Sequence, residues 1–418
     1  MSATDIITND LRIQLQHWQS AIARLDRLED IASPEGWRML ERETNSVLRS
    51  TIRKSIASLQ DTAQKIANQF GRSNPGHIAK QIHEIRRDYL RTETMLDFFA
   101  DAINSRSSAD TARLMRGLDR VATEGMRRIL EPLDLPVAPL IAYIDRGLGA
   151  SILKAGLRLW DRRSVSPVAS VKVVRHNLLT ATSLLHEIGH QVSFQTGWNG
   201  ELASALATSL PRAVASTFAS WASEIAADAI GYVYTGHASI AGLRNVVDGG
   251  IRQVFRYIPG DPHPIGMVRV LMLCEFAKST MGSKSMRDNR PWIELEDVWR
   301  RKYPLSLADR SVARTIRQSI AALPALAEVT LGRKYEAFGN KRLIDLVDPR
   351  LVSPENLDRF EQEAGARAFE LPYTVRQNPI RLLALSGLRI ATDPIRGRDY
   401  YRKQERALQV LGEQARAA

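Results

Sequence analysis

The most chemically informative segment of the chain is His186-Glu187-Ile188-Gly189-His190. Residues four apart on an α-helix share a face, so His186 and His190 can direct both imidazoles at one metal ion. Glu187 lies beside that face, where its carboxylate can accept a proton from a metal-bound water. The apolar residues around the pentapeptide favour a helix. The segment therefore predicts a helix that supplies two metal ligands and a general base.

A third protein ligand is needed, because a catalytic zinc ion uses three side chains and keeps one open position. If that ligand followed in the same segment, a glycine would stand at 193 and a histidine at 196, but these positions hold Ser193 and Thr196. Further along, Glu224 and Asp228 stand one helical turn apart. Glu224 completes a His, His, Glu set, and Asp228 can accept the second ring N–H of a liganding histidine.

The two-part pattern, His186-Glu187-x-x-His190 followed by Glu224-x-x-x-Asp228, resembles the gluzincins, the thermolysin-like clan of zinc metallopeptidases. The resemblance covers roughly residues 140–275. It implies Zn²⁺ on His186, His190 and Glu224, with Glu187 as general base and Asp228 as the partner that orients a liganding histidine. The clan also holds an extended peptide on a strand edge, and residues 169–174 (ASVKVV) stand at a suitable place before the motif helix.

The segment from Asp261 to Arg269 (DPHPIGMVR) resembles a His-Pro element found downstream in some zinc peptidases. There a histidine or an arginine faces the oxyanion that develops on the attacked carbonyl. Such a donor contributes about 3–4 kcal/mol to stabilising the transition state. His263 and Arg269 are the catalytic candidates for this role. The alternative is a loop in which His263 only caps local structure and Arg269 makes a surface ion pair.

Helical patterns dominate the rest of the chain, which at 418 residues is longer than one compact core usually holds. Apolar residues at three- and four-residue steps through roughly residues 5–105 predict long helices in a bundle or hairpin. Residues 139–144 (PLIAYI) and 169–174 are the best strand candidates. We expect a mainly α (α+β) protein with a helical N-terminal region at 1–107, a zincin-like domain with a small sheet at 108–335, and an irregular helical C-terminal extension at 336–418.

Composition and charge narrow the cellular context. No stretch of the sequence reaches the roughly 18 apolar residues of a membrane span, and the N-terminus lacks the pattern of a signal peptide. Cys274 is the single cysteine, which favours a reducing, cytoplasmic location, although leaderless or injected export would leave no such trace. The net charge of +12 lies mainly in residues 111–335, which favours an Arg-rich solvated face. The alternative is that this basic region attracts an acidic substrate, nucleic acid or an anionic surface. No nucleic-acid motif accompanies the charge, so nucleic acid is not an expected partner.

Together these patterns predict a zinc-dependent metallopeptidase that acts on a peptide or protein substrate. In this interpretation Glu187 takes a proton from zinc-bound water and later delivers it to the leaving amine. Two alternatives remain open. One is a non-catalytic, partner-binding or particle-associated protein with a structural or vestigial zinc site, and the other is an injected or toxin-like peptidase effector. The N-terminal helices are candidates for binding a protein partner or for self-association.

Overall fold

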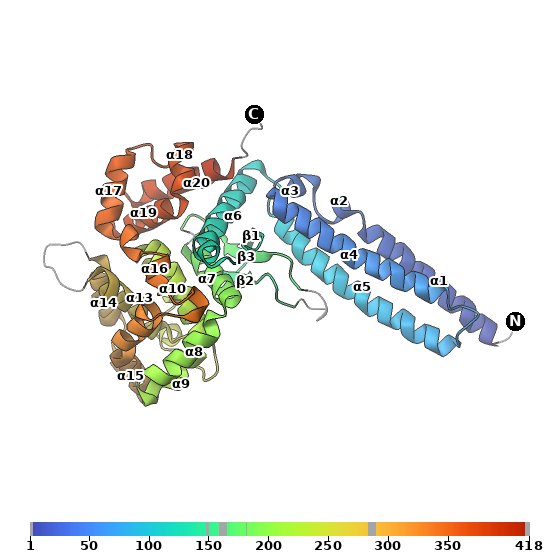
Figure 1. The fold of residues 1–418 in the computed structure, drawn as a ribbon, viewed down its shortest axis with the longest axis horizontal. Coiled ribbons are helices and arrows are strands. Elements are labelled where there is room, and N and C mark those ends of the chain that lie inside the picture. The colour runs from blue at the N-terminus through green and yellow to red at the C-terminus, as the bar shows by residue number, and fades with distance from the viewer. Residues whose placement is uncertain (1–2, 148–149, 159–164, 181, 283–289, 414–418) are drawn as a thin grey trace. The chain divides into compact units, whose positions relative to one another are not determined.

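A computed structural model describes residues 3–147, 150–158, 165–180, 182–282 and 290–413 of the chain (Figure 1). The protein is mainly α-helical with one small three-stranded sheet, which confirms the expected fold class. The chain divides into two compact units. The first contains the described residues up to Ala112 together with Pro139–Tyr143 and Leu153–Ser170, and the second contains Arg113–Ala138, Ile144–Ile152 and the residues from Val171 onward.

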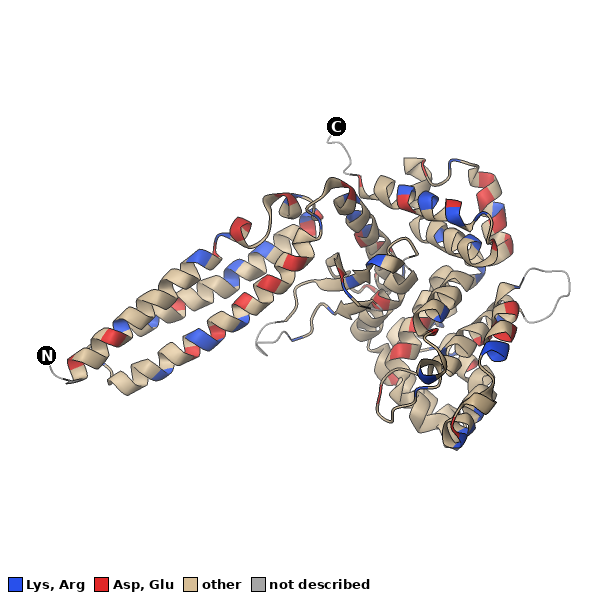
Figure 2. Cartoon of the chain, turned by 180° about the vertical axis from the view of Figure 1, so that it is seen from behind, with Lys and Arg blue, Asp and Glu red and all other residues tan. Residues whose placement is uncertain are grey.

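Three long helices form most of the first unit: α1 (Ala3–Leu25), α4 (Arg42–Ala67) and α5 (Pro75–Asn104), with the short α2 (Leu28–Ile31) and α3 (Pro34–Arg38) between α1 and α4. Each long helix buries one apolar stripe at helical spacing and exposes charged residues of both signs elsewhere (Figure 2). The buried stripes include Leu11, Leu15 and Ile22 of α1, Leu48, Ile52 and Ile56 of α4, and Ile78, Ile82 and Ile85 of α5. The periodic pattern thus confirms the predicted helical N-terminal region.

The sheet contains β1 (Leu140–Asp145), β2 (Ser151–Leu153) and β3 (Ala169–Val174), in the order β1-β3-β2. The two longer strands confirm the strands predicted from sequence. β3 is the middle strand, so the edges of this sheet are β1 and β2. The expectation that residues 169–174 offer an edge for an extended peptide is therefore wrong, because β3 has a hydrogen-bonded neighbour on each side.

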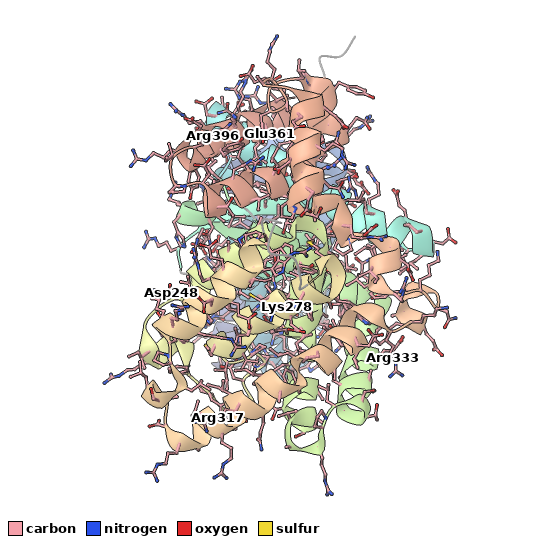
Figure 3. The ribbon with its side chains drawn as sticks, turned by 90° about the vertical axis from the view of Figure 1, so that its left-hand side faces the viewer. Asp248, Lys278, Arg317, Arg333, Glu361 and Arg396 are labelled. Atoms are coloured by element: carbon pink, nitrogen blue, oxygen red, sulfur yellow. The ribbon has the colours of Figure 1, made fainter. Side chains whose placement is uncertain are left out.

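Helices make up most of the second unit. The charged side chains of Arg317, Arg333 and Arg396 are exposed at its surface (Figure 3). From Arg113 on it contains α6 (Ala109–Leu130), followed by α7 (Thr182–Thr196), α8 (Trp198–Ser209), α9 (Arg212–Ser220), α10 (Ala222–Thr235), α11 (His237–Val247), α12 (Ile251–Val254), α13 (Gly266–Met281), α14 (Pro291–Lys302), α15 (Arg310–Ala327), α16 (Leu343–Leu346), α17 (Pro354–Ala364), α18 (Pro372–Gln377), α19 (Pro379–Thr392) and α20 (Gly397–Gly412). Short 3-10 turns lie at Glu131–Leu133, Arg175–Asn177, Leu305–Leu307, Glu336–Phe338 and Pro349–Val352, and a π-helical turn follows α15 at Glu328–Gly332.

Helix α10 is buried along almost its whole length. Every residue of α10 except Ser223 is buried, and the helix packs against α7, α8, α11, α13 and α19. A helix with protein on all sides must be apolar or must pair its polar groups. The two carboxylates on α10, Glu224 and Asp228, therefore need partners from the neighbouring helices.

The C-terminal residues fold as part of the second unit. Arg116 on α6 donates a hydrogen bond to the Gly412 carbonyl at the end of α20, with a donor–acceptor distance of 3.0 Å. The helices α17 to α20 confirm the helical character predicted for this region, while the domain boundaries predicted at 107 and 335 stay predictions.

Cys274 lies on α13 and is fully buried, and this burial raises the pKa of its thiol. Within the described residues, no helix combines the length and the apolar character needed to cross a membrane.

Candidate metal centre

Helix α7 presents the two histidines of the motif on one face. His186 and His190 stand one turn apart, and their ring centroids are 4.8 Å from each other. The surrounding positions Leu184, Leu185 and Ile188 are fully buried. These apolar side chains pack into the core and so fix the orientation of α7. As a result, the face that carries the two histidines points toward the neighbouring helix α10.

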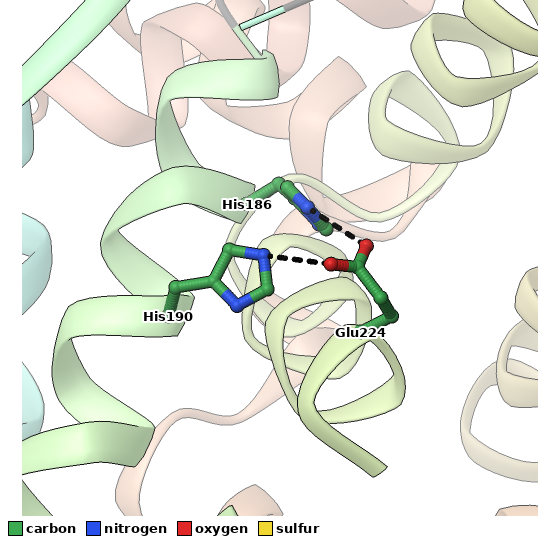
Figure 4. Close-up of side chains that lie close together, drawn as sticks. All are labelled: His186, His190 and Glu224. Carbon is green, nitrogen blue, oxygen red and sulfur yellow. Dashed lines mark ion pairs between the residues drawn. The ribbon is translucent and has the colours of Figure 1, made fainter. Parts of the chain in front are cut away.

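Helix α10 brings Glu224 to these histidines (Figure 4). Nε2 of His190 lies 3.2 Å from Oε1 of Glu224, and Nε2 of His186 lies 3.6 Å from Oε2 of the same carboxylate. The potential ligand atoms of the three residues all lie within 4.8 Å of one another. Their side chains are only 18%, 11% and 9% exposed for His186, His190 and Glu224. Two imidazoles and one carboxylate thus converge in an arrangement that could hold a metal ion.

The close approach of α7 and α10 depends on a small residue between the two histidines. A Cβ atom at Gly189 would lie 2.8 Å from Cα and 2.9 Å from the carbonyl oxygen of Ala227 on α10. These are backbone atoms, which cannot move aside as a flexible side chain can. The glycine inside the motif therefore sets the distance at which Glu224 meets the histidines.

Each histidine has a partner on its other ring nitrogen. Oδ1 of Asp228 lies 2.8 Å from Nδ1 of His186, which is the contact expected for Asp228 from the sequence. Oγ of Ser223 lies 3.3 Å from Nδ1 of His190. Partners on Nδ1 fix the orientation of the rings and leave Nε2 as the ligand atom. Sequence reasoning missed Ser223, although its position directly before Glu224 on the same helix is a signal that could have identified it.

Arg269 on α13 contacts both carboxylates of α10. Its Nε and Nη2 donate to Oδ2 and Oδ1 of Asp228 at 2.6 and 2.9 Å, and Nη2 also donates to Oε2 of Glu224 at 2.9 Å. The same Nη2 lies 3.4 Å from Nε2 of His186. The guanidinium side chain is only 10% exposed. The surface ion pair considered for Arg269 is therefore wrong, because the guanidinium is buried and its Nε and Nη2 are engaged by Asp228 and Glu224. The expected contact of Arg269 with a substrate oxyanion stays a prediction.

His263 lies at the solvent side of the centre. Its side chain is 59% exposed, and its Nε2 lies 3.7 Å from Oε1 of Glu224. Oδ1 of Asp261 lies 2.8 Å from Nδ1 of His263 and also accepts a hydrogen bond from the His263 backbone N–H at 3.0 Å. Asp261 thereby orients the imidazole with Nε2 toward the centre. The role of Asp261 was not anticipated from sequence, although its position two residues before His263 favours this turn.

The buried charges of the centre shift one another's ionisation. Burial opposes charge on Glu224, but the hydrogen bond from His190 and the charge of Arg269 outweigh it and lower the pKa of Glu224. Burial likewise opposes charge on Asp228, and Arg269 and His186 overcome it to lower the pKa of Asp228. Both carboxylates are therefore ionised at neutral pH, as metal binding requires.

Glu187 has the opposite electrostatic environment. Its side chain is buried, and the loss of hydration raises the pKa of its carboxyl group, even though His186 and His190 favour the charged form. A buried carboxyl group with a raised pKa beside ionised carboxylates is a candidate functional group. The two kinds of carboxyl group in the centre are thus suited to different roles.

Comparisons with protein-family models, with curated proteins and with solved structures find no match for this chain.

Proposed function

We propose that this protein is a zinc-dependent metallopeptidase that hydrolyses peptide bonds. The observation that carries the proposal is the convergence of His186, His190 and Glu224 beside the buried carboxyl group of Glu187. Among the described residues the ligand group has three members, which is the number of protein ligands typical of a catalytic zinc site. A structural zinc site is usually closed by a fourth protein ligand.

The residues present fit a zinc ion. Imidazole nitrogen and carboxylate oxygen are ligands that zinc accepts, and the Nδ1 partners Asp228 and Ser223 match the outer contacts of zinc-binding histidines. When bound, zinc would polarise the substrate carbonyl and lower the pKa of a water molecule toward about 7. His186, His190 and Glu224 would hold the ion.

Glu187 is proposed to move the proton in the reaction. Its carboxylate takes the proton from the attacking water and delivers it to the nitrogen of the leaving amine. The raised pKa of Glu187 suits the first step, because a carboxylate with a higher pKa is a stronger base.

His263 and Arg269 are proposed to act in different ways. His263 is exposed and held by Asp261 through Nδ1, so its Nε2 can donate to the developing oxyanion of the substrate when the ring carries a proton on both nitrogens. Arg269 is buried against Asp228 and Glu224, and we assign it a positioning role: it holds the ligand Glu224 and the His186 partner Asp228 in place.

The first experiment measures metal content by elemental analysis in the wild type, in Glu224→Ala and in Glu187→Gln. We expect about one zinc per chain in the wild type, a strong loss in Glu224→Ala and retention in Glu187→Gln, because of these two glutamates only Glu224 is a proposed ligand. A wild type that binds no zinc, or a Glu224→Ala variant that binds it normally, would contradict the proposed site.

The second experiment measures cleavage of a peptide library by mass spectrometry. Glu187→Gln serves as a control that retains the metal, and we expect its cleavage rate to fall about 10²-fold or more, the range for loss of a general base. Full activity in Glu187→Gln would overturn the mechanism. Zinc binding without cleavage of any peptide would instead favour the non-catalytic alternative.

A further inference from the structure

Three histidines face the carboxylate of Glu224 in the same way. The Nε2 atoms of His186, His190 and His263 lie 3.6, 3.2 and 3.7 Å from its oxygens. Each of these rings also has an oxygen atom near Nδ1, at 2.8, 3.3 and 2.8 Å respectively. His263 therefore repeats the arrangement of the two histidines that are proposed to bind zinc. The residues that supply the oxygen near Nδ1 are, in the same order, Asp228, Ser223 and Asp261.

The distance between His263 and Glu224 suits two ligands of one ion. At 3.7 Å, Nε2 of His263 and Oε1 of Glu224 are too far apart for a hydrogen bond. Two ligand atoms that each lie about 2.0–2.1 Å from a tetrahedral zinc ion are about 3.3 Å apart. The distances from His186 and His190 to the same carboxylate, 3.6 and 3.2 Å, lie on either side of that value. The spacing at His263 is thus close to the spacing at the two proposed ligands.

Asp261 determines which ring nitrogen of His263 is free to bind a cation. An ionised carboxylate only accepts hydrogen bonds, so Nδ1 of His263 is the donor in its 2.8 Å contact with Oδ1 of Asp261. In the neutral ring Nε2 then carries a lone pair, and it lies next to the negatively charged Glu224. A cation between these two electron-rich atoms stabilises both. Asp261 and His263 together therefore have the arrangement of a metal-binding histidine with its supporting carboxylate.

His263 differs from the other two histidines in its exposure and its position in the fold. It lies in the loop between α12 and α13, and its side chain is 59% exposed, compared with 18% and 11% for His186 and His190. Pro262 and Pro264 flank it and restrict the loop backbone. His263 is outside the group whose ligand atoms all lie within 4.8 Å of one another, so its side chain must move inward to bind. A ligand of this kind can bind and leave without any change in the helices.

We propose that His263 is an exchangeable fourth ligand of the metal ion: its Nε2 binds the ion in the substrate-free protein and leaves when a substrate binds. This inference rests on the proposed zinc site of His186, His190 and Glu224. With four protein ligands the position for a water molecule is filled, and the departure of His263 opens it. The displaced side chain is then free to face the developing oxyanion, so the same residue has one role before substrate binding and another after it.

The test counts the imidazole ligands of the zinc-loaded protein by X-ray absorption spectroscopy at the zinc edge. We expect three imidazoles in the wild type and two in His263→Ala. His176→Ala is the matched control and should keep three, because His176 is also an exposed histidine and is outside the ligand group. Acetohydroxamate, a small chelator that imitates a bound substrate, should reduce the count in the wild type from three to two.

Zinc affinity, measured in competition with a chelator, provides an independent readout. Loss of a residue that only supports a ligand weakens metal binding about 10–100-fold, so loss of the ligand itself in His263→Ala should weaken it at least about tenfold. Asp261→Ala should also weaken zinc binding. Acetohydroxamate should bind zinc-loaded His263→Ala more tightly than the wild type, because no protein ligand has to leave. The side chains of His263 and Asp261 are 59% and 30% exposed, so neither substitution opens the core.

The outcomes separate this inference from the zinc site itself. Two imidazoles in both the wild type and His263→Ala, with equal zinc affinities, would overturn the inference and leave the zinc site standing. Three imidazoles that persist when acetohydroxamate is bound would overturn the exchange, because the site would then be permanently closed. A wild type that binds no zinc would refute the proposed site and this inference with it.

Discussion

Replacing Arg269 tests whether the metal centre is held together by a buried ion pair. In Arg269→Met the side chain keeps much of its length but loses its charge, so Asp228 loses its two hydrogen bonds and Glu224 loses one. Asp228 is 4% exposed and cannot recover its hydration without opening the core. Removing one partner of a buried ion pair destabilises a protein by about 3–5 kcal/mol, because an uncompensated charge remains. We expect a loss in this range for the metal-free protein.

The assay is urea unfolding in EDTA, followed by the fluorescence of tryptophans in the second unit such as Trp198 and Trp221. Arg402→Met is the matched control, because the Arg402 side chain is 80% exposed and also pairs with a carboxylate, that of Asp399. An exposed pair of this kind contributes no more than about 1 kcal/mol. The free energy of unfolding should therefore fall several times more in Arg269→Met than in Arg402→Met.

A double variant separates charge from packing. If the unpaired carboxylate causes the loss, adding Asp228→Asn to Arg269→Met should cost less than the two single changes together, because no buried charge at 228 then remains. The reasoning would be refuted by an Arg269→Met variant that loses no more stability than Arg402→Met. It would also be refuted by strictly additive losses in the double variant.

Two further predictions concern packing and pH. Gly189→Ala should lower both the free energy of unfolding and the zinc content, because overpacking against the Ala227 backbone costs about 1–3 kcal/mol. Gly200→Ala on α8 has nothing within 4 Å of its added Cβ and should instead stabilise by about 0.5–1 kcal/mol, so equal effects in urea unfolding would contradict the helix-spacing argument. Burial opposes charge on Glu361, but Tyr400 and Arg389 outweigh it and lower its pKa below the usual 4.5. A lowered pKa stabilises the folded state above pH 4.5, and this contribution is lost as the pH falls. The difference in unfolding free energy between the wild type and Glu361→Gln should therefore shrink between pH 7 and about pH 3. A difference that does not change with pH would contradict the lowered pKa of Glu361.

Much of the candidate site could be predicted from the sequence because its residues occur in short helical patterns. His186 and His190 follow the four-residue step of a helix, and so do Glu224 and Asp228, and a helix fixes which side chains share a face. The long apolar stripes of the N-terminal helices were predictable for the same reason.

The contacts of Arg269 and the order of the sheet could not be predicted in this way. Nothing in the residues around Arg269 distinguishes an arginine that faces a substrate from one that pairs with Asp228 on another helix. The position of β3 depends on β2, which has only three residues and therefore gives almost no alternating pattern.

The burial of Cys274 has a practical consequence for labelling. This chain has one cysteine, and that thiol is enclosed in the core of the second unit with a raised pKa, so it presents no reactive thiolate to solvent in the folded state. A cysteine introduced at an exposed position, for example in place of Arg317 or Arg396, would then be the single site open to a maleimide. Fluorophores and spin labels can therefore be attached one at a time without first replacing the native cysteine.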